Sequence, residues 1–145
     1  MTMLGVPKIS GISPIEEQVN PTLWSLLTWY IKIYKDFIRP IQRSCLVYDH
    51  EPVIKGVSGT GWSALEFDSP EKDRGYFFIS RLPDAQKDGY TFVSKGLDAD
   101  RRYRLTFCSS GKSFRIDGSA LTGTGFTVTL ENPLTSELFL VEECE

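Results

Sequence analysis

The stretch Lys95–Phe107 reads KGLDADRRYRLTF, and it decides the fold class. Its first part, GLDAD, is rich in the glycine and aspartate that favour turns. Polar and apolar residues then alternate along Arg102, Tyr103, Arg104, Leu105, Thr106 and Phe107. Successive side chains of a strand point to opposite faces, so this alternation predicts a half-buried strand with its aromatic and leucine side chains facing a core.

The same reading applies to most of the chain after residue 42. Short segments rich in β-formers alternate with turns containing Gly, Pro, Asp and Ser. The segment 74–81 is almost continuously apolar, which is typical of a strand buried on both faces. We expect strands at 44–48, 52–56, 62–67, 74–81, 90–94 and 102–107, then around Phe114 and Ile116, within 123–130 on the face of Phe126, Val128 and Leu130, and at 136–141.

No helical pattern is evident between these segments, which excludes alternating strands and helices around a parallel sheet. The sequence therefore predicts a mainly β protein, an antiparallel β-sandwich of about eight strands preceded by one amphipathic α-helix. We expect an N-terminal segment and helix over residues 1–41 and a β-sandwich domain over residues 42–145.

The expected helix spans Asn20–Pro40, which reads NPTLWSLLTWYIKIYKDFIRP. Asn20 is suited to cap the first turn, Pro21 fits the first helical position, and Pro40 is expected to end the helix. At 3.6 residues per turn, one narrow stripe is polar: Ser25, Thr28, Lys32, Lys35, Asp36 and Arg39. The remaining arc of roughly 220° is apolar, whereas a helix facing one core needs only about 100°.

Such a wide apolar arc predicts that the helix contacts two bodies. One is the rest of this chain, and the other is a second copy, another domain or another protein. A membrane span is excluded because Lys32, Lys35 and Asp36 interrupt a short apolar run, and one narrow stripe of mixed charge gives little support to a helix lying flat on a membrane. The residues expected at the interface are Leu23, Trp24, Leu27, Trp29, Tyr30, Ile33, Tyr34 and Phe37.

Composition excludes several function classes. The chain has 145 residues, 16 basic and 19 acidic, and a formal charge of −3, so there is no electrostatic case for binding nucleic acid. Three cysteines without metal-like spacing are expected to be reduced thiols, and the single histidine, His50, cannot form a site of several imidazoles. We expect no metal and no cofactor. The first residues lack a signal-peptide pattern, which predicts a cytoplasmic protein.

Few residues suggest chemistry. The aspartates lie in apparent turns, where Asp commonly bonds the backbone, and Tyr48-Asp49-His50 has no evident nucleophile beside it. SSGKS at 109–113 precedes a strand rather than a helix, so it reads as a hairpin turn and not as a phosphate loop. Tyr48, Trp62 and Tyr76 are candidates for an aromatic platform that binds carbohydrate, although a tryptophan at a strand start more often serves packing.

Several motifs in order resemble a known family. They are WSALEFDSPEKDRGYFFISRL, then GLDADRRYRL, then spaced glycines and LTSELFLVE. This order is similar to the C-terminal β-sandwich of glycoside hydrolase family 36, the alpha-galactosidase (melibiase) family. Upstream, LWSLLTWYIKIYKDFIRP resembles the helix that ends the catalytic barrel of that family, and GVPKIS resembles the last strand of the barrel.

The resemblance implies a role without catalysis for this part of the chain. In such an enzyme the helix lies between barrel and sandwich, and the two catalytic aspartates belong to barrel strands that nothing here matches. Asp36 lies on the polar stripe of the helix and is not expected to be a nucleophile. We therefore expect an accessory domain that stabilises the barrel or mediates oligomerisation, with a stand-alone carbohydrate-binding module as the alternative.

Overall fold

The structure is a computed structural model that describes residues 20–51 and 61–145. The chain divides into two compact units, 1–43 and 44–145. The expected strand at 52–56 and the segment GVPKIS lie outside the described residues. Among the described residues, none of the helices combines the length and the apolar character needed to cross a membrane.

The first unit contains the expected helix, and its start is as predicted. It comprises α1 (Pro21–Ile33), a π-helical turn η2 (Tyr34–Ile38) and α2 (Arg39–Gln42). The side-chain oxygen of Asn20 accepts hydrogen bonds from the backbone N–H groups of Thr22 and Leu23, at 2.9 and 3.3 Å. Two of the first free N–H groups of the helix are thereby satisfied.

The predicted end of the helix was wrong, because the helical backbone passes Pro40 and continues to Gln42. Proline has no N–H group to bond the preceding turn. The turn just before it is widened, since the N–H of Arg39 bonds the carbonyl of Tyr34 five residues earlier. A π-helical turn of this kind lets a helix absorb an irregular position without ending.

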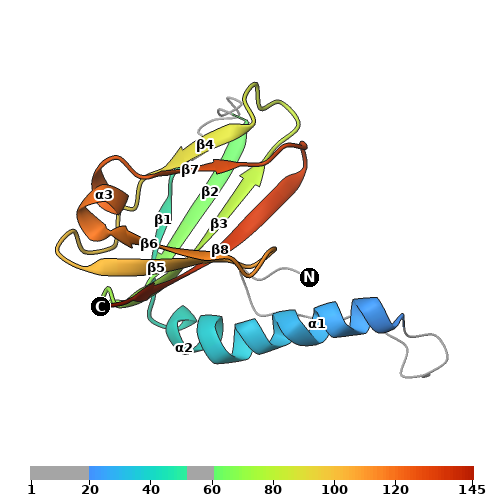
Figure 1. Ribbon diagram of the computed structural model, residues 1–145, viewed down its shortest axis with the longest axis horizontal. Helices are drawn as coiled ribbons and strands as arrows, with labels where there is room; N and C mark the ends of the chain where they lie inside the picture. The colour runs from blue at the N-terminus through green and yellow to red at the C-terminus, as the bar shows by residue number, and fades with distance from the viewer. Residues whose placement is uncertain (1–19, 52–60) are drawn as a thin grey trace. The chain divides into compact units, whose positions relative to one another are not determined.

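The second unit is the predicted antiparallel sandwich (Figure 1). Six strands form one sheet in the order β1-β2-β3-β8-β5-β6, and β4 and β7 form a second sheet that lies across one face of it. The nearly continuous apolar segment is β3, and its successive residues Tyr76 and Phe77, which lie on opposite faces, are both fully buried, as expected. The strands are β1 (Leu46–Asp49), β2 (Trp62–Asp68), β3 (Arg74–Arg81), β4 (Gly89–Phe92), β5 (Arg102–Phe107), β6 (Ser113–Asp117), β7 (Phe126–Thr129) and β8 (Thr135–Glu143).

A short helix between β6 and β7 was missed. It is α3 (Gly118–Gly123), and the sequence reading had placed no helix between the strands. Six residues are too few to show a helical period, so the pattern carried no signal. The helix contributes Leu121, which is fully buried, and the carbonyl of Leu121 accepts a hydrogen bond from the N–H of Ser94. It thus closes one end of the core.

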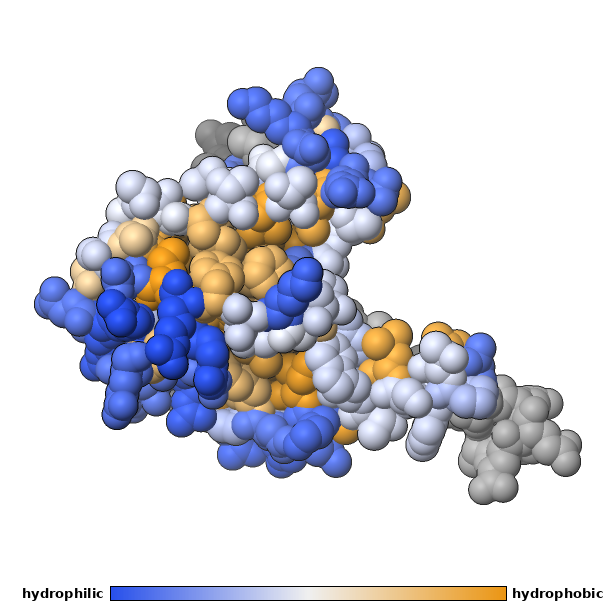
Figure 2. All heavy atoms as spheres, in the orientation of Figure 1, coloured by the Kyte–Doolittle hydropathy of each residue, from blue (hydrophilic) through white to orange (hydrophobic). Residues whose placement is uncertain are grey.

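The core lies between the two sheets. Tyr103 and Leu105 are fully buried while Arg102 and Arg104 are exposed, so the alternation in this strand was read correctly. Apolar atoms also show at the surface between β7 and the β5–β6 end of the larger sheet (Figure 2). The buried cluster comprises Trp62, Ala64, Phe77, Ile79, Ala85, Phe92, Leu97, Tyr103, Leu105, Leu121, Val128, Phe139 and Val141.

The Tyr103 hydroxyl joins two loops at one end of the sandwich. It donates to the carbonyl oxygen of Lys72 at 2.8 Å and accepts from the backbone N–H of Asp98 at 3.0 Å. Lys72 belongs to the polar β2–β3 turn, and Asp98 to the predicted GLDAD turn. A residue in a regular strand therefore fixes two turns that are remote from each other in sequence.

Candidate functional site

The helix of the first unit presents apolar side chains at its surface. Leu23, Trp24, Leu26 and Trp29 are 63%, 52%, 49% and 38% exposed. No residue of α1 is fully buried. Exposed apolar side chains grouped on one element are typical of an interaction surface. The other predicted interface residues are half-buried: Leu27, Tyr30, Ile33, Tyr34 and Phe37.

The polar stripe of this helix carries one internal ion pair. The ammonium nitrogen of Lys32 lies 2.5 Å from a carboxylate oxygen of Asp36, one turn further along. Both side chains are exposed, so this pair contributes little to stability. Asp36 thus occupies an exposed ion pair on a helix surface, in keeping with the expectation that it is not a nucleophile.

The three aromatic side chains proposed for carbohydrate lie on two different faces of the large sheet. Trp62 is 4% exposed and belongs to the core between the sheets. Tyr48 pairs with Glu66 across β1 and β2, on the same face as Trp62. Tyr76 is fully buried on the opposite face, where its ring stacks on Phe67 with centroids 4.5 Å apart. The structure does not bring the three rings together, and carbohydrate binding by them stays a prediction.

A buried polar cluster surrounds Glu66 on β2, and the sequence reading missed it. Its carboxylate accepts hydrogen bonds from the Ser94 hydroxyl at 2.5 Å, from the N–H of Lys95 at 2.9 Å and from the N–H of Gly96 at 3.1 Å. Nε2 of His50 lies 2.7 Å from Oε2, the carboxylate oxygen that also accepts from Lys95, whereas Ser94 and Gly96 bind Oε1. Glu66 itself is fully buried. The only sequence signal for a buried Glu66 was its position, since it lies four residues after Trp62 and therefore on the same face of the strand.

A second carboxyl group, that of Asp68, lies two residues further along the same face and is also fully buried. It fits between Gly75 and Gly96, because a Cβ atom on either glycine would collide with a carboxyl oxygen of Asp68. Among the described residues, no N–H or hydroxyl donor reaches either of its oxygens. Two adjacent buried carboxyl groups cannot both be ionised at low cost.

The proton of this pair belongs to Asp68. Burial, followed by the charge of the adjacent Glu66, raises the pKa of Asp68 to about 9. Burial acts to raise the pKa of Glu66 too, but hydrogen bonds from His50, Ser94 and the backbone N–H of Lys95 outweigh it and lower that pKa. Glu66 is therefore the carboxylate and Asp68 the neutral acid at pH 7. The cluster ties β1, β2 and the loop after β4 together, which is a structural role.

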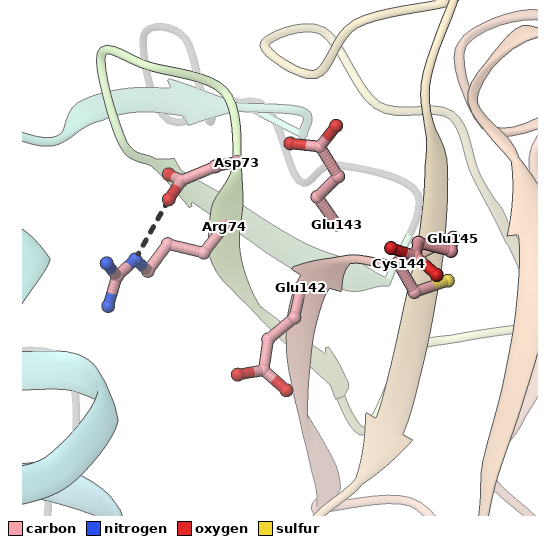
Figure 3. A pocket seen from close by; sticks show the side chains of 6 residues that line it. All are labelled: Asp73, Arg74, Glu142, Glu143, Cys144 and Glu145. Atoms are coloured by element: carbon pink, nitrogen blue, oxygen red, sulfur yellow. Dashed lines mark ion pairs between the residues drawn. The ribbon is translucent and has the colours of Figure 1, made fainter.

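An acidic hollow of about 580 Å³ lies where β3 begins and β8 ends (Figure 3). In Figure 3 the side chains of Glu142 and Glu143 leave the strand in opposite directions. Both are already paired, Glu142 with Arg104 at 2.8 Å and Glu143 with Arg101 at 2.9 Å. The acidic hollow is lined by Asp73, Arg74, Glu142, Glu143, Cys144 and Glu145.

The carboxylates of this hollow do not form a metal centre. Asp73 is bound by the Ser69 hydroxyl at 2.6 Å, and that hydrogen bond is the main reason that its pKa is lowered. Across residues 20–51 and 61–145, no three side chains of the kinds that ligate metals are grouped closely enough to hold an ion. Among the described residues, no disulfide joins the three cysteines, Cys45, Cys108 and Cys144.

Comparison with known proteins gives a likeness of fold. No family model matches this sequence, and no curated protein matches it. The GH36 alpha-galactosidase AgaA from Geobacillus stearothermophilus matches 89% of this chain with a TM-score of 0.68 and 18% identity. The alpha-galactosidase from Lactobacillus brevis matches 89% with a TM-score of 0.67 and 18% identity. The galactosidase domain of the alpha-galactosidase-sucrose kinase AgaSK matches 88% with a TM-score of 0.64 and 17% identity.

The chain spans 17%, 18% and 17% of those three proteins, respectively. At this level of identity the likeness shows the fold alone. The helix followed by a sandwich is thus an arrangement found within GH36 alpha-galactosidases, in agreement with the fold that the sequence resemblance implied.

Proposed function

We propose that this chain is a non-catalytic accessory region of an alpha-galactosidase-like glycoside hydrolase, in which it stabilises the catalytic barrel or mediates oligomerisation. The observation that carries the proposal is the match of 89% of this chain to a small part of GH36 alpha-galactosidases. The exposed apolar side chains of α1 support it, since they offer a surface for a second body. The polar clusters of the sandwich are occupied by internal hydrogen bonds and ion pairs, which fits a structural role.

The physical action proposed for the helix is burial of apolar surface against its partner. Leu23, Trp24, Leu26 and Trp29 each retain substantial exposure in this chain. Fully burying a large apolar side chain contributes about 1.5–3 kcal/mol. Because these four side chains are only partly exposed, covering all of them contributes on the order of 3–6 kcal/mol, which is comparable to the cost of association, so the half-buried residues of the helix must contribute as well.

The size of the native gene product tests the enzyme context directly. An antibody raised against residues 44–145 is used to probe a lysate of the source cells under denaturing conditions. The proposal expects a band several times larger than the 16.4 kDa of this chain, because the matched enzymes are far longer. A band at 16.4 kDa would contradict an accessory role within a larger enzyme.

The helix surface is tested separately by light scattering of the isolated chain. With its barrel absent, the chain is expected to form a dimer through the exposed face of α1, because an apolar patch favours association. Replacing Trp24 and Trp29 by alanine should give a monomer, while Lys35→Ala on the polar stripe should leave the dimer intact. A double alanine variant with the same mass as the wild type would refute the assignment of this face.

A further inference from the structure

A hollow beside β4 combines an aromatic pair with polar side chains. The rings of Trp62 and Tyr90 stack with centroids 5.3 Å apart and planes inclined by 28°. The Tyr90 hydroxyl donates to a carboxylate oxygen of Glu51 at 3.2 Å. Trp62 is almost wholly buried while Tyr90 is half-buried, so Tyr90 supplies the aromatic surface. The hollow measures about 360 Å³ and is lined by Glu51, Trp62, Gln86, Lys87, Gly89, Tyr90 and Thr91.

A second hollow of about 550 Å³ adjoins the first. The two share Gln86, Lys87 and Gly89, so they lie along the same segment that leads into β4. Arg81 borders the second hollow and donates from Nη1 to the carbonyl oxygens of Leu130 and Glu131, at 2.7 and 2.8 Å. The second hollow is lined by Arg81, Gln86, Lys87, Asp88, Gly89 and Glu131.

Hydrogen-bonding capacity remains along these hollows. Arg81 uses Nη1 for two backbone carbonyl oxygens, and its Nε is buried without a hydrogen-bond partner among the described residues, so that N–H is out of reach of a ligand. The Gln86 amide nitrogen donates to the carbonyl of Asp84 at 3.1 Å, which leaves the amide oxygen of Gln86 as an acceptor. Lys87 is exposed and carries three donors. Donors and acceptors are therefore mixed along the lining.

The charge of the lining is also mixed. Lys87 and Arg81 are cationic, whereas Glu51, Asp88 and Glu131 are carboxylates. Burial, followed by the influence of Glu51, raises the pKa of Tyr90, so its phenol stays a neutral donor to that carboxylate. An anionic or cationic ligand would meet a repelling group in either hollow. A purely apolar ligand would take water away from Lys87, Asp88 and Glu131 without offering them a hydrogen bond, which is costly.

We propose that these two hollows bind a neutral oligosaccharide, with one sugar ring against Tyr90 and the next beside Lys87 and Arg81. A sugar presents an apolar C–H face to an aromatic ring, and its hydroxyl groups both donate and accept hydrogen bonds. The 360 Å³ hollow accommodates one ring, and the adjoining hollow accommodates another. The site is distinct from the helix surface and does not rest on the enzyme context proposed for the chain.

Trp62 provides the signal for a direct test, because it is the only tryptophan of residues 44–145. In a variant with Trp24→Phe and Trp29→Phe, tryptophan emission reports on Trp62 alone. This protein is titrated with raffinose, maltotriose and cellotriose up to about 50 mM, above the millimolar Kd that corresponds to roughly 4 kcal/mol. We expect a saturable change with at least one sugar. The absence of a saturable change with all three would overturn the proposal.

Variants then locate the site. Lys87→Ala changes an exposed side chain and is expected to weaken binding about tenfold, while Tyr90→Phe, which keeps the ring but removes the bond to Glu51, should weaken it less. The matched control is Lys112→Ala in the exposed β5–β6 turn, which should leave the Kd unchanged. If Lys87→Ala binds as tightly as Lys112→Ala, the sugar is bound elsewhere and the proposed site is wrong.

Discussion

Replacing Asp68 by asparagine should remove a large pH dependence from the stability of the sandwich. Asp68 is fully buried beside the Glu66 carboxylate, and its pKa is raised from 3.8 to about 9. Between these two pKa values, the native state holds one proton that the unfolded chain has released. A raised carboxyl pKa stabilises the fold fully below the unfolded pKa, and that contribution is lost as the pH rises toward the folded pKa.

The size of the effect follows from the number of protons involved. One proton bound only by the native state lowers the free energy of unfolding by about 1.4 kcal/mol for each unit of rising pH. Between about pH 5 and pH 8 the loss amounts to roughly 4 kcal/mol, a large share of the stability of a domain. Glu66 adds no slope in this window, because its lowered pKa keeps it ionised in both states.

The assay is urea unfolding followed by circular dichroism at several pH values, with linear extrapolation to water. An asparagine side chain at this position has nearly the same shape but does not titrate, so the Asp68→Asn variant should lack the slope of about 1.4 kcal/mol per pH unit. Asp84→Asn, at an exposed position, is the matched control and should keep the wild-type slope. Equal slopes for Asp68→Asn and wild type would refute the assignment of the proton to Asp68.

Three further outcomes follow from the described contacts. Glu66→Gln replaces the carboxylate that Ser94 and two backbone N–H groups bind, and should lower the free energy of unfolding by about 2–3 kcal/mol in urea titrations at pH 7; wild-type stability would refute the cluster. Tyr103→Phe removes the bonds to Lys72 and Asp98 and should cost about 1–2 kcal/mol by the same assay, with no loss counting against the bridge. Burial, followed by the neighbouring Glu137, raises the pKa of the Cys108 thiol to about 12, so mass spectrometry should find it alkylated by iodoacetamide only after unfolding; labelling of the folded chain would contradict this.

The sequence predicted a strand well where one face of that strand is buried and the other is exposed to solvent. The alternation from Arg102 to Phe107 matches β5, and the apolar run 74–81 matches β3. Both signals come from local periodicity, which a sheet with a solvent face imposes directly. The cap at Asn20 was also predictable, because capping depends on one side chain and the adjacent backbone.

The remaining features depend on residues distant in sequence. The helix passes Pro40 because the backbone widens into a π turn, a choice that residue preferences alone do not specify. The cluster around Glu66 depends on two residues that are distant in sequence. His50 follows β1, and Ser94 lies in the loop after β4. Trp62 lies on the opposite side of its strand from Phe67, and only the second sheet shows that the side of Trp62 is the core.

The position of β8 has a consequence for how the chain folds during synthesis. The last strand in sequence lies between β3 and β5, so the large sheet is divided into β1-β2-β3 and β5-β6 until β8 is available. Until then, β3 and β5 each have an unpaired edge, and an unpaired strand edge can pair with the wrong strand. A ribosome that stalls before residue 135 therefore presents two separate parts of the large sheet, and the sandwich can be completed only after β8 has been made.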